Sequence, residues 1–128
     1  MTKKIVTMPS GKLTDWRILL VEDEYYIADD LRRALGNEGA MILGPFASVD
    51  PASAAARAAE LDCAVLDLNL QGELSFALYE ELAERGVPLV VVSGYDRTSI
   101  PPQFAGITLL SKPVDTDRLV QCVAEKLR

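Results

Sequence analysis

The chain has 128 residues, of which 49% are hydrophobic, so it has enough apolar material for one globular domain with a single core. This length leaves no room for a separate effector domain of ordinary size. With 13 basic and 19 acidic residues the net charge is −6, which argues against direct binding of nucleic acid, because phosphate backbones are bound by basic surfaces.

The sequence also indicates the compartment. No stretch approaches the ~20 apolar residues of a membrane span, and the first residues lack the apolar core and cleavage site of a secretory signal. Cys63 and Cys122 are too few for a disulfide framework, and a chain without histidine is a poor candidate for a zinc or haem site. We therefore expect a cytoplasmic protein with reduced thiols and no membrane contact.

The first part of the chain predicts a tail, a strand and a helix. Residues 1–16 show no periodicity and include a Pro-Ser-Gly sequence, so we interpret them as an N-terminal tail that leads into a domain over 17–128. The apolar run Arg17–Val21 predicts a buried strand. An amphipathic helix is predicted over about 24–38, and Gly39 is typical of a helix end.

The middle of the chain repeats this alternation. Ala40–Gly44 predicts a second strand, which we expect Pro45 to close. A second helix is predicted over 50–61, with Asp50 as its N-cap and a proline at its first position. Cys63–Leu66 predicts a third strand.

The last part predicts two more strands. A helix over 75–85 precedes Val87–Val92, which has no polar residue and is typical of a central strand covered on both faces. Ile107–Leu110 predicts a fifth strand, and a helix over 115–127 follows. Strands that alternate with helices predict a doubly wound α/β fold with a five-stranded parallel sheet.

One segment departs from the alternation. A fourth helix is expected between Tyr95 and Gly106, but Pro101 and Pro102 remove two backbone donors there. We therefore expect this helix to be short, irregular, displaced or mobile.

Polar side chains follow four of the predicted strands. They are Glu22 and Asp23 after the first strand, Asp67 after the third, Ser93 after the fourth, and Ser111 and Lys112 after the fifth. Because the carboxyl ends of parallel strands share one edge, we expect these side chains to converge in one crevice. Two carboxylates ~4 Å apart repel each other by about 4 kcal/mol at an effective dielectric near 20. A cation or a shared proton must offset this repulsion.

Carboxylate oxygens of this kind suit Mg²⁺, which also binds phosphate oxygens. One carboxylate can then act as a nucleophile and form an acyl phosphate, and we choose Asp67 because it projects alone into the centre of the edge. Lys112 and Ser93 are expected to contact the transferred phosphoryl group, the first as a point charge and the second as a hydroxyl donor.

Four segments together resemble a known family. Leu20–Glu24, Val65–Asn69, Val92–Gly94 and Ser111–Pro113 are similar, in order and spacing, to the signature blocks of receiver domains of two-component response regulators. The resemblance extends over 17–128. It implies a flavodoxin-like sheet with strand order 2-1-3-4-5.

The resemblance implies a role for each strand-end residue. Asp67 would be the phosphoacceptor, Asp23 would bind Mg²⁺ directly and Glu22 through water, and the backbone carbonyl of Asn69 would be a further metal ligand. Ser93 would be the switch hydroxyl and Lys112 the phosphate-binding lysine, followed by a Pro113 that often forms a cis peptide.

The function implied is that of a single-domain response regulator. It would accept a phosphoryl group from a sensor histidine kinase or a histidine phosphotransfer protein and signal by contact with a downstream protein. It would catalyse only its own phosphorylation and dephosphorylation. Leu109 stands where the family usually has a switch aromatic, and Ser93-Gly94-Tyr95 resembles the FATGUY-type subfamily, which HWE-type kinases typically serve.

Other readings of the same residues remain open. A phosphatase of the haloacid-dehalogenase type also uses a strand-end aspartate with Mg²⁺, but Asn69 stands where that class has its second aspartate. A Glu-Asp pair after a strand is often only a helix cap, and Asp67 could cap a turn. Asn69 could form a helix or a turn without binding a metal. Tyr25 and Tyr26 are interpreted as half-buried helix aromatics. A flavin site is disfavoured because acids after the first strand would repel a phosphate.

Overall fold

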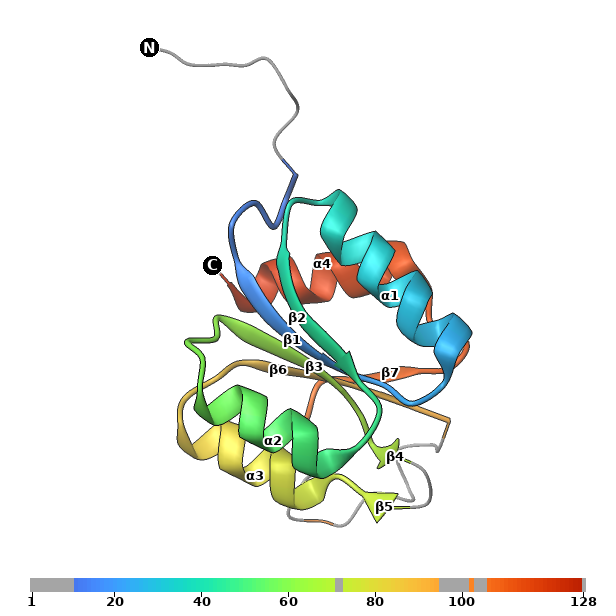
Figure 1. Cartoon of the computed structure of the whole chain (residues 1–128). Helices are drawn as coiled ribbons and strands as arrows, with labels where there is room; N and C mark the ends of the chain where they lie inside the picture. The colour runs from blue at the N-terminus through green and yellow to red at the C-terminus, as the bar shows by residue number, and fades with distance from the viewer. Residues whose placement is uncertain (1–10, 71–72, 95–101, 103–105, 128) are drawn as a thin grey trace.

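A parallel sheet of five strands forms the centre of the molecule (Figure 1). This computed structural model describes residues 11–70, 73–94, 102 and 106–127. In spatial order the strands are β2 (Met41–Phe46), β1 (Arg17–Val21), β3 (Cys63–Asp67), β6 (Leu89–Ser93) and β7 (Leu109–Ser111). Counted along the chain, this is the order 2-1-3-4-5, so the predicted doubly wound α/β fold is confirmed.

Helices cover both faces of the sheet (Figure 1). One face carries α1 (Tyr25–Asn37) and α4 (Thr116–Lys126), and the other carries α2 (Val49–Arg57) and α3 (Phe76–Glu84). Side chains alternate between the two layers, because successive residues of a strand point to opposite faces. Ile18 and Leu20 of β1 pack under α1 and α4, whereas Leu19 and Val21 pack under α2 and α3.

The second strand does not end at Pro45, as the sequence predicted, but continues to Phe46. A proline is tolerated here because β2 lies at the edge of the sheet, where one row of backbone groups has no strand to bond. The pairing of β1 with β2 is irregular between Leu19 and Val21. Gly44 lies opposite this irregularity with a φ of +114°, and a Cβ on it would lie 2.5 Å from the Leu20 carbonyl oxygen, so only glycine fits.

The helix α2 begins one residue before the predicted start and ends earlier. Its N-cap is Ser48, and Asp50 lies in its first turn rather than at the cap. Pro51 is accommodated there because the first N–H groups of a helix have no intrahelical acceptor. The helix ends at Arg57, although the alanine-rich sequence predicted a helix through Leu61.

Some features lie outside the sequence prediction or outside the described residues. A small antiparallel pair, β4 (Asn69–Leu70) with β5 (Glu73–Leu74), was not predicted. The predicted fourth helix falls on 95–106, of which only two residues are described. No helix in the described part of the chain has the length and apolar character needed to cross a membrane.

The domain boundary stays a prediction, but part of the predicted tail is packed. Leu13 is fully buried in the core under α1 and α4, and its N–H donates to the Glu38 carbonyl at 2.9 Å. A single leucine in a polar stretch has no periodicity, so its burial leaves no pattern in the sequence. Both cysteines are free thiols; Cys63 is buried, and Cys122 on α4 is half-buried.

Candidate functional site: an acidic crevice around Lys112

The carboxyl ends of β1, β3, β6 and β7 lie side by side. Val21 of β1 pairs with Leu66 of β3, so the next residue of each strand, Glu22 and Asp67, lies at the same level of the sheet. Asp67 pairs with Val92 on the next strand, and Ser93 pairs with Ser111 on the one after. The sheet therefore gathers the predicted strand-end residues at one edge.

The ammonium group of Lys112 is the centre of this crevice. Its Nζ lies 2.9 Å from Asp67 Oδ2, 3.0 Å from Glu22 Oε1 and 2.8 Å from Glu24 Oε1. The first two partners were predicted as neighbours of Lys112, but Glu24 was not assigned to the site. The sequence does place Glu24 directly after the Glu-Asp pair, but we interpreted that position only as the start of a helix.

The edge strand fixes the position of Glu22. Its N–H donates to the Phe46 carbonyl at 2.9 Å, a bond that exists because β2 passes through Pro45. Its Oε2 accepts the N–H of Glu24 at 3.1 Å. With an exposed fraction of 2%, Glu22 is a carboxyl group buried in the fold rather than a solvated helix cap.

The turn after β3 fixes Asp67 in a similar way. Its Oδ1 accepts the N–H of Asn69 at 3.1 Å, and the N–H of Leu68 donates to the Val92 carbonyl. The hydroxyl of Ser75, which is fully buried, donates to the carbonyls of Asp67 and Leu68 at 2.7 and 3.2 Å. Ser75 was predicted only as the first residue of a helix, yet it braces the turn that carries Asp67.

Lys112 is tied to the sheet by its backbone. Its N–H donates to the Ser93 carbonyl at 2.8 Å, so the ends of β6 and β7 are joined at this point. The Lys112–Pro113 peptide bond is cis, as the resemblance implies. Ser93 itself is 1% exposed at the end of β6.

Burial and repulsion perturb the titration of this cluster. Burial, followed by the interaction with Asp67, raises the pKa of Glu22 to about 7, although the N–H of Glu24 and the ammonium of Lys112 act in the opposite direction. Burial by itself would lower the pKa of Lys112, but its bonds to Glu24, Asp67 and Glu22 outweigh burial, and the net shift is upward. Lys112 therefore stays charged, while Glu22 is a poor anion unless another cation is present.

The donor set fits a divalent cation. Carboxylate oxygens of Glu22, Glu24 and Asp67 lie within 4.8 Å of one another. These three groups face one ammonium, which leaves a formal excess of two negative charges, and hard oxygen ligands suit Mg²⁺. Among the described residues Asp23, which is half-buried, does not belong to this close set, whereas Glu24 does.

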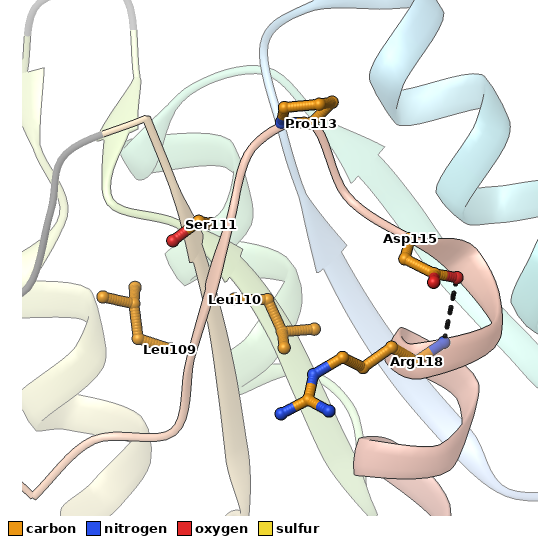
Figure 2. Close-up of a pocket in the computed structure, with 6 residues that line it drawn as sticks. All are labelled: Leu109, Leu110, Ser111, Pro113, Asp115 and Arg118. Carbon is orange, nitrogen blue, oxygen red and sulfur yellow. Dashed lines mark hydrogen bonds between the residues drawn. The ribbon is translucent and has the colours of Figure 1, made fainter.

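A groove of about 390 Å³ lies beside the crevice, between β7 and the start of α4 (Figure 2). Figure 2 shows Leu109 and Leu110 pointing to opposite sides of β7. Leu110 packs under α4, and Leu109 packs against Leu68 and Val91. The position where the resemblance implies a switch aromatic is thus filled by a half-buried aliphatic side chain.

Comparison with known proteins now identifies the family. The model of the response regulator receiver domain matches residues 18–124. This chain belongs to the receiver-domain family. Receiver domains are signalling domains that accept a phosphoryl group, bind Mg²⁺ at an acidic pocket and interact with histidine kinases or phosphotransfer proteins. The haloacid-dehalogenase alternative finds no support in these comparisons.

Solved structures agree with this assignment. The chain is 34% identical to SdrG from Sphingomonas melonis Fr1 in solution, covering 92% of this chain and 99% of SdrG with a TM-score of 0.76. It is 30% identical to the BeF3-activated conformation of SdrG from Pseudomonas melonis Fr1, covering 94% and 100% with a TM-score of 0.74. A CheY-like receiver domain protein from Methanospirillum hungatei JF-1 is 26% identical, with coverages of 89% and 94% and a TM-score of 0.78. No curated protein sequence matches this receiver domain.

Proposed function

We propose that this receiver domain accepts a phosphoryl group on Asp67 from the phosphohistidine of a sensor histidine kinase or a phosphotransfer protein. The observation that carries the proposal is the environment of the Asp67 carboxylate. It is 3% exposed, Oδ1 accepts the Asn69 N–H, and Oδ2 contacts the Lys112 ammonium, so it is fixed at the crevice floor. A carboxylate fixed in this way is oriented for attack.

The transfer is a displacement at phosphorus. An oxygen of Asp67 forms the new O–P bond, the P–N bond to the donor imidazole breaks, and the electron pair stays on the departing nitrogen, which takes up a proton. Lys112 balances charge on the phosphoryl oxygens, and the Ser93 hydroxyl, at the end of the adjacent strand, donates a hydrogen bond to one of them. Later hydrolysis of the acyl phosphate returns Asp67 and releases inorganic phosphate.

Receiver domains bind Mg²⁺, and a bound divalent cation would neutralise the negative charge of the phosphoryl oxygens. We assign Asp23, Asp67 and the backbone carbonyl of Asn69 as its direct ligands and Glu22 as a ligand through water. The excess of two negative charges in the cluster supports a divalent ion. Binding of the ion also favours the ionised form of Glu22, whose pKa burial raises to about 7.

The partners follow from the same resemblance. We propose an HWE-type histidine kinase as the donor, because Ser93-Gly94-Tyr95 resembles the FATGUY-type blocks. We propose that the regulator acts in the cytoplasm and that its output is contact with a downstream protein. Leu109 replaces the usual aromatic, so no aromatic ring at this position can couple to the Ser93 hydroxyl.

The test is phosphorylation by acetyl phosphate with Mg²⁺, read by intact-protein mass spectrometry. Wild-type protein should gain one phosphoryl group, Asp67→Asn should gain none, and Asp30→Asn, an exposed acid on α1, should behave as wild type. Labelling of Asp67→Asn at the wild-type level would refute the assignment. Sustained turnover of a small phosphoester would instead identify a phosphatase.

A further inference from the structure

All three donors of the Lys112 ammonium group are already engaged. An ammonium group has three N–H bonds. Hydrogen bonds run from Nζ to Glu24 Oε1 at 2.8 Å, to Asp67 Oδ2 at 2.9 Å and to Glu22 Oε2 at 3.2 Å. For Lys112 to donate to a phosphoryl oxygen, one of these three carboxylates must release it.

The three carboxylates differ in the cost of release. The side chains of Glu22 and Asp67 are 0% and 4% exposed, whereas that of Glu24 is 59% exposed. A buried carboxylate that loses its cation stays desolvated, whereas an exposed one is solvated again at once. Glu24 is therefore the partner that gives up Lys112 most easily.

Helix capping does not explain the orientation of Glu24. Glu24 is the N-cap of α1, yet its side chain makes no capping hydrogen bond. Asp115, the N-cap of α4, accepts the N–H groups of Asp117 and Arg118 in the usual way. The Glu24 side chain turns instead to Lys112, so its position reflects the site rather than the helix.

We propose that Glu24 is a positioning residue that retains Lys112 in the unphosphorylated protein and competes with the phosphoryl group for it. The inference rests on the proposed phosphorylation of Asp67. Glu24 then sets how tightly the crevice takes up a phosphoryl group or its mimic, because each binding event must first break its contact with Lys112. An ordinary N-cap residue at position 24 would remove this competition.

The first measurement is the affinity for beryllofluoride at saturating Mg²⁺. Glu24→Gln and Glu24→Ser should both bind it roughly two- to tenfold more tightly than wild type, as expected for loss of one partly exposed ion pair and one nearby negative charge. Glu24→Ser also introduces a favourable cap, whereas Glu24→Gln does not, so agreement between them separates the site effect from helix stability. Asp30→Asn, which removes the same charge further along α1, controls for net charge.

The second measurement follows the reactivity of the Lys112 amine in the absence of any phosphoryl mimic. Trace acetylation of the metal-free protein is followed by peptide mass spectrometry, with exposed Lys126 as an internal reference. Loss of the Glu24 contact should increase the relative labelling of Lys112 several-fold in both variants and leave it unchanged in Asp30→Asn.

The outcomes separate this inference from the proposed function. Unchanged labelling of Lys112 in both variants overturns the competition, whether or not the protein is phosphorylated. Weaker beryllofluoride binding, or weaker Mg²⁺ binding by calorimetry than in Asp30→Asn, overturns it in favour of Glu24 as a metal ligand. If wild-type protein binds no beryllofluoride while Lys112 labelling rises, the proposed function fails and the retention of Lys112 by Glu24 stands.

Discussion

The two ends of the central sheet use charged residues in opposite ways. At the carboxyl end, the Lys112 side chain is 14% exposed and contacts two carboxylates that are almost fully buried. At the amino end, Arg17 is 47% exposed and pairs with Glu60, which is 86% exposed, at 3.0 Å. The distances are alike, but the carboxyl end removes two carboxylates almost completely from water, whereas Asp62, the second partner of Arg17, is still 28% exposed. Desolvation rather than distance decides what an ion pair does.

The largest expected difference between the two ends comes from removing each cation. Lys112→Met keeps the aliphatic stem but leaves Glu22 and Asp67 buried without a counter-charge, so we expect a loss of about 3 kcal/mol in the free energy of unfolding at pH 8 without divalent metal. Urea denaturation measures it. Equal losses of unfolding free energy in Lys112→Met and Arg17→Met would contradict the difference between the two ends of the sheet.

The second difference is a pH dependence confined to the carboxyl end. Because the pKa of Glu22 rises from 4.5 to about 7 on folding, its contribution to stability is complete below pH 4.5 and is lost as the pH rises through about 7. Without metal, Glu22→Gln should therefore be more stable than wild type at pH 8, by up to about 3 kcal/mol, with no such gain at pH 4.

Divalent metal sharpens this prediction. Mg²⁺ should raise the melting temperature of wild-type protein, since it relieves the repulsion between Glu22 and Asp67, and should raise that of Glu22→Gln less. Sodium chloride at equal ionic strength is the control. A gain from Glu22→Gln that is equal at pH 4 and pH 8 would contradict the assigned titration.

The smallest effect is expected at the amino end. Arg17→Gln should lower the free energy of unfolding by no more than about 1 kcal/mol, because Glu60 is solvated with or without its partner. Salt should reduce even this difference, since exposed pairs are screened. A loss as large as that of Lys112→Met would show that exposure does not separate the two ends.

Much of this architecture is readable from the sequence because buried strands leave a strong pattern. The run that contains β6 is uninterrupted by polar residues, and the structure buries it on both faces. Asp67 was predicted as a site residue because it directly follows the apolar run Cys63–Leu66, and Lys112 because it lies just after the predicted strand Ile107–Leu110. The pattern is local, so no distant contact was needed to find it.

Other features depend on contacts between distant segments. Pro45 predicted a strand end, but β2 lies at an edge, and an edge strand tolerates a residue without an N–H. The burial of Leu13 and the bracing role of Ser75 likewise depend on which surfaces the fold brings against them. A single residue has no periodicity that could reveal its partner.

The sequence by itself determined which polar residues follow the predicted strands, and with them the family and the candidate residues, because hydrophobic runs dictate which segments form the centre of the sheet. Only the tertiary structure decided how those residues share charge. Glu24 and Lys112 are 88 positions apart, and their contact exists because β1 and β7 end at the same edge. The convergence of the strand ends at that edge, which no local pattern records, leaves three carboxylates to share one ammonium group.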